Sequence, residues 1–314
     1  AAGPWVDEVC GLEGPQAPRL ALSRGVHLVF NHADLPVRNT VVMRTPDGRR
    51  IFAVPLGQYT YIGTTDDYHP EFEYWPPVTE QDVNYLLSST RRVMPEASLS
   101  PEQIVSVWSG IRPLVGDGSG RASKELSRKD EVWTSPSGLL SVGGGKLSAY
   151  RAMAERVVDT VIENHDFTAK PCATAQVPLP GGETAVSADR LSGVEGAPAE
   201  RLARLYGAEA SEVVSSAGEG GLLAAEVRQA VLREGALRLE DYWARRSSRA
   251  WFDHDAGLPV LTQAADVMAN LLGWDDSRKA TEINNCREID RASRSGFQSA
   301  TTSLGEADDY RAAS

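Results

Sequence analysis

The feature that most constrains the fold is a run of glycines between an apolar segment and an amphipathic one. Residues 139–159 read LLSVGGGKLSAYRAMAERVVD, which is typical of a strand that turns through glycine into a long helix. At such a turn, the backbone N–H groups of Gly144, Gly145 and Lys146 lack helical partners and carry the positive end of the helix dipole. The spacing leaves two interpretations open: an anion pocket beside Lys146, or a tight turn with an exposed lysine.

Two common phosphate-binding loops do not fit these glycines. A Walker loop requires glycine where Leu140 stands and serine or threonine where Leu147 stands, so the turn is not an ATP-hydrolysing loop. A second cluster, Gly116, Gly118 and Gly120, lacks the third glycine of G-x-G-x-x-G, and we expect a surface turn there.

The composition narrows the class of protein. A chain of 314 residues with 41% hydrophobic content can bury a sizeable core, and its length favours two domains. A formal net charge of -11 without a basic block argues against a general nucleic-acid binder. Cys10, Cys172 and Cys286 form no C-x-x-C pair, which predicts a reducing compartment and buried or inert thiols. No apolar run reaches the roughly 20 residues that span a bilayer, so we expect any membrane contact to be peripheral.

The first half of the chain predicts an antiparallel sheet covered by a helix. In the strand expected at 26–30 the apolar residues alternate, which puts His27 on the face opposite the core. A turn signal at 46–48 separates later strands, and Thr79 with Asp82 is typical of a capping box that opens a helix. The expected strands are 26–30, 41–44, 51–56, 59–64, 104–108, 132–134 and 139–142.

The second half predicts a helical domain. Prolines and glycines within 166–198 mark a linker, and helical patterns follow it. The best helix is expected at about 224–246, with Val227 and Trp243 among the inward-facing residues. Beyond Arg291 few large apolar residues remain to offset the entropy of ordering, so a disordered tail is expected. At the other end, the opening residues resemble a strand already completed, and we expect an N-terminal half to precede them.

A few polar residues could carry chemistry. Arg112 follows an expected strand and precedes a proline, so its guanidinium could be held for phosphate or carboxylate, or could form a structural salt bridge. His27 could move a proton near neutral pH, or could be a hydrogen-bonded surface residue. Asp66, Asp67 and His69 are close in sequence, but no further cluster completes a metal site, and we expect none.

Several segments, in their order along the chain, resemble the C-terminal portion of FAD-dependent glycerol-3-phosphate dehydrogenases. They are AAGPWVDEV, RGVHLVF, IFAVPLGQYTYIGTTDDYH, VTEQDVNYLL, SVWSGIRPLVGDG and LLSVGGGKLSAYRAMAERVVD. Two later segments, EVRQAVLREGALRLEDYWARRSSRAWF and ADVMANLLGW, resemble the C-terminal domain of that family. The resemblance implies an α+β fold, in which an antiparallel or mixed sheet forms the substrate domain of an FAD-dependent oxidoreductase and an all-α C-terminal domain follows.

The resemblance also implies domain boundaries. The expected parts are a remnant of the FAD-binding domain at 1–20, the sheet domain at 21–137, a strand-turn-helix completing the FAD-binding domain at 138–165, the linker at 166–198, the helical domain at 199–290 and the tail at 291–314.

By resemblance, the cofactor is FAD, and the reaction oxidises sn-glycerol 3-phosphate to dihydroxyacetone phosphate by hydride transfer to the flavin. The glycine-lysine turn aims a helix N-terminus at the flavin edge where negative charge develops. The cofactor-binding residues implied are Ala2, Gly3, Gly144, Gly145, Lys146, Leu147 and Ser148. The resemblance further implies a quinone as electron acceptor, a cytoplasmic location with peripheral contact at the inner face of the cell membrane, and a homodimer.

The same resemblance assigns substrate roles to three residues. Arg112, in SGIRPL, matches an arginine that binds the substrate phosphate, and Lys146 reaches the same site. His27, in RGVHLVF, matches the histidine lining the substrate pocket and is the candidate for helping to remove the proton of the C2 hydroxyl. These three residues are the implied catalytic and substrate-binding set.

Two departures from the family pattern leave alternatives open. Ser148 and Ala149 replace the two threonines of G-G-K-L-T-T, so that one hydroxyl is lost, and the sequence contains no G-x-G-x-x-G motif. The alternatives are another FAD-dependent amine or hydroxy-acid oxidase of the same superfamily, and a non-catalytic interaction fragment.

Overall fold

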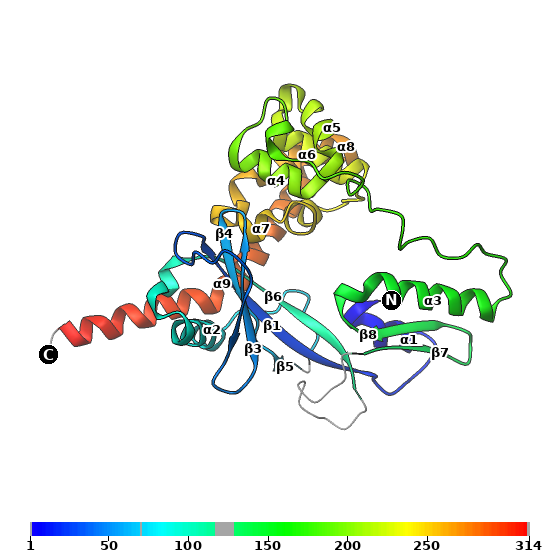
Figure 1. Cartoon of the computed structure of the whole chain (residues 1–314), viewed down its shortest axis with the longest axis horizontal. Coiled ribbons are helices and arrows are strands. Elements are labelled where there is room, and N and C mark those ends of the chain that lie inside the picture. The colour runs from blue at the N-terminus through cyan, green and yellow to red at the C-terminus, as the bar shows by residue number, and fades with distance from the viewer. Residues whose placement is uncertain (1, 70, 117–128, 313–314) are drawn as a thin grey trace. The chain divides into compact units, whose positions relative to one another are not determined.

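The computed structural model describes residues 2–69, 71–116 and 129–312, in two compact units (Figure 1). Unit 1 comprises Ala1–Gly25, Thr65–Pro76 and Ser109–Pro178, and unit 2 comprises Val26–Thr64, Pro77–Trp108 and Leu179–Ser314. Strands β1 (Leu20–Asn31) and β6 (Ile104–Val115) run through both units and pair with each other. The predicted domain boundaries run in sequence order, whereas these units interleave, and we keep those boundaries as a proposal.

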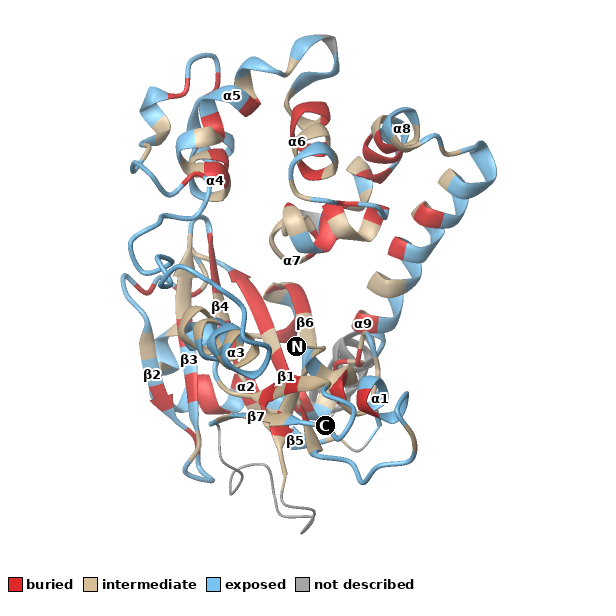
Figure 2. Cartoon of the chain, turned by 90° about the vertical axis from the view of Figure 1, so that its right-hand side faces the viewer, coloured by how far each residue is buried: buried red, intermediate tan, exposed pale blue. Residues whose placement is uncertain are grey.

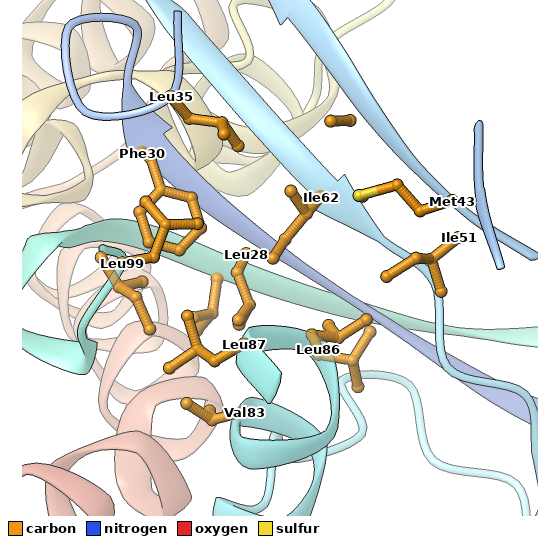
Figure 3. Packing of buried hydrophobic residues seen from close by; sticks show 14 of the residues in the cluster. Leu28, Phe30, Leu35, Met43, Ile51, Ile62, Val83, Leu86, Leu87 and Leu99 are labelled. Carbon is orange, nitrogen blue, oxygen red and sulfur yellow. The ribbon is translucent and has the colours of Figure 1, made fainter. Parts of the chain in front are cut away.

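Unit 2 contains the predicted antiparallel meander. Strands β2 (Val41–Arg44), β3 (Arg50–Leu56) and β4 (Tyr59–Gly63) follow one another, and β4 pairs with β1 so that His27 lies opposite Gly63. Helix α2 (Glu80–Val93) begins at the predicted capping box of Thr79 and Asp82. Its apolar face packs on the strands in one hydrophobic core, where Leu86 and Leu87 contact strand residues such as Leu28 (Figure 3).

Unit 1 differs from the prediction in two places. Residues 132–134 and 139–142 were expected to rejoin the large sheet, but β7 (Asp130–Thr134) and β8 (Leu140–Gly144) form a separate two-stranded sheet. Strand β6 was expected to end at 108, yet it continues through Arg112 and the proline after it. Pairing with strand β1 explains the extension. Strand β1 is also longer than expected, and the Gly116 N–H donates to the Arg19 carbonyl at 2.8 Å, just before β1 begins.

Unit 1 also contains the short strand β5 (Asp67–Tyr68), which pairs with the first half of β1, and the helices α1 (Val6–Gly11) and α3 (Tyr150–Asn164). The surface turn expected at Gly118 and Gly120 lies outside the described residues.

The C-terminal part of unit 2 is helical, as predicted, which confirms the α+β fold. Figure 2 shows the buried faces of helices α6 and α8. Its helices are α4 (Gly196–Tyr206), α5 (Ala210–Ser215), α6 (Gly221–Leu232), α7 (Arg249–Phe252), α8 (Leu261–Leu272) and α9 (Asp276–Ala312), with a π-helix, η9, at Asp241–Arg246.

One prediction about these helices was wrong. The single helix expected at 224–246 ends at Leu232, because Gly235 adopts a φ of +66°, and the chain resumes as the π-helix. Helix α9 extends through the predicted tail to Ala312, and the disorder of this tail stays a prediction. The start of the tail packs on the rest of unit 2, since Ser293 is buried and the Arg294 guanidinium donates to the Val105 carbonyl. Among the described residues, no helix is both long and apolar enough to cross a membrane.

The three thiols have different environments. Cys10 and Cys286 are buried, as expected, whereas Cys172 is exposed. Burial, together with the charges of Glu240 and Glu282, raises the pKa of the Cys286 thiol to about 12. Thiolate is the reactive form, so Cys286 is protected by its pKa as well as by its burial.

We therefore expect a thiol reagent at mildly alkaline pH to modify one thiol per native chain, at Cys172, and three after denaturation. The measurement is a colorimetric thiol titration with and without denaturant. Cys172→Ser is the control and should leave the native chain unreactive. Rapid modification of a second native thiol would contradict the burial of Cys10 and Cys286.

Candidate functional site

The glycine turn predicted from the sequence is present at the end of β8. Gly144 and Gly145 have φ values of +72° and +81°, which other residues rarely adopt. A Cβ on Gly144 would also lie 2.7 Å from the Lys129 carbonyl oxygen. Lys146 is extended, and a 3-10 turn at Leu147–Ala149 leads into α3 with no side chain capping it. The turn thus presents backbone N–H groups at the start of a helix of 15 residues.

An open pocket of ≈ 670 Å³ lies within unit 1 at this turn. Its lining residues are Ile111, Arg112, Pro113, Leu114, Gly144, Gly145, Lys146, Leu147, Tyr150 and Met153. The pocket brings together Arg112, from strand β6, with Lys146 and the two glycines, although more than 30 positions separate them in the sequence. Ser148, Ala2 and Gly3 are not among its lining residues.

Oxygen atoms of Asp66, Ser23 and Thr65 anchor the Arg112 guanidinium. Nη1 lies 3.2 Å from Asp66 Oδ1 and 3.4 Å from Ser23 Oγ, and Nη2 donates to the Thr65 carbonyl at 3.2 Å. The two interpretations of Arg112, salt bridge and anion ligand, are therefore compatible, because the residue forms a salt bridge with Asp66 and also lines the pocket.

His27 belongs to unit 2, in an aromatic cluster. Its ring stacks on the Trp108 ring with centroids 4.8 Å apart and an interplanar angle of 16°, and the Tyr61 ring lies 6.0 Å away. Phe252, from α7, packs against both Trp108 and Tyr61. A Cβ on Gly63, across the strand pair, would lie 2.2 Å from His27 Cδ2. The absence of a side chain at Gly63 therefore makes room for the imidazole.

Sequence reasoning missed several residues around these groups. Tyr150, the first residue of α3, and Met153, about one turn further, line the pocket, and helical spacing from the glycine-lysine turn could have indicated both. Asp66 was considered only as a metal ligand, whereas its carboxylate accepts from Ser23 Oγ at 2.8 Å and pairs with Arg112. No local pattern pointed to Trp108, because its importance comes from packing across the sheet.

The helical part of unit 2 contains a buried ionic cluster centred on Glu226 in α6. The Glu226 side chain is 3% exposed; its carboxylate lies 2.7 Å from Arg201 Nη1 and 3.3 Å from Arg249 Nη2. Tyr242, in the π-helix, donates to the same carboxylate at 3.5 Å. Burial would lower the pKa of Arg249, but neighbouring Tyr242, Glu226 and Asp253 raise it above its usual value. Arg249 therefore keeps its positive charge.

The sequence of this chain is similar to FAD-dependent oxidoreductases. Residues 1–151 match the family model described as FAD dependent oxidoreductase, and residues 172–279 match that of the C-terminal domain of alpha-glycerophosphate oxidase. The chain is 32% identical over 318 residues to the aerobic glycerol-3-phosphate dehydrogenase of Bacillus subtilis, covering 92% of this chain and 57% of that relative. For the enzyme of the same name from Staphylococcus saprophyticus, identity is 33% over 327 residues, covering 96% of this chain and 58% of the relative.

The similarity extends to three dimensions. The structure of the glycerol-3-phosphate dehydrogenase from Bacillus halodurans complexed with FAD matches with a TM-score of 0.80 and 31% identity, covering 93% of this chain and 61% of that one. The chain thus spans somewhat over half the length of the relatives it matches. The resemblance drawn from the sequence is confirmed.

Proposed function

Because this chain belongs to the FAD-dependent glycerol-3-phosphate dehydrogenase family, we propose that it binds FAD and oxidises sn-glycerol 3-phosphate to dihydroxyacetone phosphate. The observation that carries the proposal is the pocket of unit 1, where Arg112, Lys146 and the glycine turn meet. A guanidinium, an ammonium group and backbone N–H groups at a helix start are all suited to a phosphate dianion. An amine or hydroxy-acid oxidase would not require two cations at one pocket.

The glycine turn fits the cofactor as well. Its backbone is bare of side chains at Gly144 and Gly145, and the helix start that follows has no side-chain cap. We propose that Gly144, Gly145, Lys146, Leu147 and Ser148 hold the flavin, and that Ala2 and Gly3 also contribute to FAD binding. Bound FAD would supply the acceptor for the hydride. The backbone N–H groups of the turn would stabilise negative charge without reorganising, because the fold fixes them in advance.

We assign the proton step to His27. An alcohol loses its hydroxyl proton as its carbon is oxidised, and imidazole is the side chain best suited to accept a proton near neutral pH. Stacking on Trp108 holds the imidazole plane, which supports a defined direction of proton transfer. Arg112 and Lys146 are expected to act earlier, by binding and orienting the phosphate.

Three further properties stay predictions based on the resemblance. These are a quinone as electron acceptor, peripheral contact with the inner face of the cell membrane from a cytoplasmic location, and a homodimer. Reduction of a soluble quinone analogue, co-sedimentation with anionic vesicles and light scattering would test them separately.

The proposed activity is tested by the visible absorption spectrum of the chain after incubation with FAD and desalting. Near-stoichiometric retained flavin that is bleached by glycerol 3-phosphate would support the proposal. A colourless protein would contradict FAD binding by this chain alone. Retained flavin that glycerol 3-phosphate does not bleach would contradict the assigned substrate.

Arg112→Ala is expected to raise KM for glycerol 3-phosphate more than it lowers kcat. The lost contact to phosphate stabilises the bound substrate and the transition state equally. A charge-assisted contact to phosphate is worth about 1.5 to 3 kcal/mol, or roughly ten- to a hundredfold in KM. Steady-state kinetics with an artificial acceptor measures the effect. Arg156→Ala, which removes a surface arginine paired with Asp130 in the same unit, is the control. An unchanged KM in Arg112→Ala would contradict the phosphate assignment.

A further inference from the structure

Asp66, Ser23 and Thr65, none of which lines the pocket, hold the Arg112 guanidinium in place. The Asp66 side chain is 11% exposed, and its Oδ1 accepts from both Arg112 Nη1 and Ser23 Oγ. Ser23 is fully buried on β1, so the carboxylate is itself held by a rigid neighbour. The Thr65 carbonyl accepts from Nη2, and the two contacts together restrain the plane of the guanidinium.

Gly25 provides the space that this arrangement needs. A Cβ added to Gly25 would lie 2.0 Å from Arg112 Nη2 and 2.5 Å from Cζ. The φ of Gly25 is not in the left-handed region, so its backbone would accept alanine without strain. The guanidinium, rather than the backbone conformation, therefore requires glycine at this position.

We propose that Gly25 and Asp66 are positioning residues for phosphate binding, which act through Arg112 and do not touch the substrate. The inference rests on the proposed function, in which Arg112 binds the phosphate of the substrate. A guanidinium that is oriented before binding loses less freedom when phosphate arrives, and its bidentate geometry is kept. Both residues belong to unit 1, as do Arg112 and the pocket.

The central test is Gly25→Ala in the FAD-loaded chain, alone and combined with Arg112→Ala. We expect Gly25→Ala to raise KM for glycerol 3-phosphate, and Kd for inorganic phosphate measured by calorimetry, about tenfold, with kcat within about twofold. In the Arg112→Ala background the same substitution should change neither constant, because the group it displaces is gone. Gly11→Ala is the matched control, since a Cβ there would meet nothing within 4 Å.

Unchanged KM and phosphate Kd in Gly25→Ala would overturn the inference, as would an equal effect with and without Arg112. Failure of the wild-type chain to bind phosphate would overturn it too. A wild-type chain that binds phosphate but does not oxidise glycerol 3-phosphate contradicts the proposed function alone, and phosphate affinities of the glycine variants still decide this inference.

Asp66 provides a second test in case Gly25→Ala does not fold. Asp66→Ala should weaken phosphate binding, whereas Asp66→Asn retains an oxygen that can accept from Ser23 and Arg112 and should recover most of the affinity. A purely structural role would be expected to change thermal stability and leave phosphate affinity alone. Equal phosphate affinity in Asp66→Ala and the wild type would overturn the role of Asp66.

Discussion

Replacing Glu226 with alanine is expected to lower the free energy of unfolding by about 3 to 5 kcal/mol, because it removes one partner from a buried ionic cluster. The carboxylate, 3% exposed, connects α4 through Arg201, α6 through its own backbone and α7 through Arg249. The two arginine side chains are only 18% and 16% exposed. Without the carboxylate, two cations would remain close together with little access to water, a cost that exceeds the loss of the contacts themselves.

Urea unfolding followed by tryptophan fluorescence measures this effect, since Trp243 and Trp251 lie in the same part of unit 2. Glu212→Ala is the matched control. Its partner Arg233 is a surface residue, the two side chains are 72% and 64% exposed, and such a pair contributes about 0 to 1 kcal/mol. A loss in Glu226→Ala no greater than in Glu212→Ala would show that the cluster does not stabilise the helices.

Replacing His27 with alanine is expected to lower kcat by about a hundredfold or more if the imidazole accepts the substrate proton. The ring is held between strand β4, where Gly63 makes room for it, and the stacked ring of Trp108. Such restraint favours a fixed role in the reaction, because general bases need defined geometry. The limb of the kcat/KM profile that reports the free enzyme's base should disappear in the variant.

The measurement is the pH dependence of kcat/KM in His27→Ala and in His165→Ala, in which an exposed histidine just after α3 serves as the control. Gly63→Ala provides a second variant, since its Cβ would displace the imidazole without removing it. A pH profile of His27→Ala that matches the wild type would make His27 a packing residue.

Local patterns were sufficient for much of the fold. The strands of the meander and the capped start of α2 agree with the sequence because alternation, turn residues and capping depend on neighbours a few positions away. The glycine turn is another local feature, since positive φ values at Gly144 and Gly145 favour glycine whatever surrounds them.

Predictions failed where distant contacts overrode local preference. Arg112 was expected beyond the end of a strand. Strand β6 instead continues past Arg112, because it pairs with β1, which is also longer than expected. The apolar periodicity of 224–246 was continuous in sequence, and the left-handed turn at Gly235 still divided it, because both halves could then bury their apolar residues, among them Val227 and Trp243. Periodicity reports which residues are buried, but it does not report whether the helix between them is continuous.

By itself, the sequence determined the element types, the family resemblance and the candidate residues Arg112, Lys146 and His27, since these depend on patterns along the chain. Only the tertiary structure decided that Arg112 and Lys146 share a pocket, that Asp66 is the counter-charge of Arg112, and that Gly25 leaves room for its guanidinium. The physical reason is that a salt bridge and a steric contact depend on distances of a few ångströms between residues on different strands. These distances are set only when the strands pair, and the order of residues along the chain does not show them.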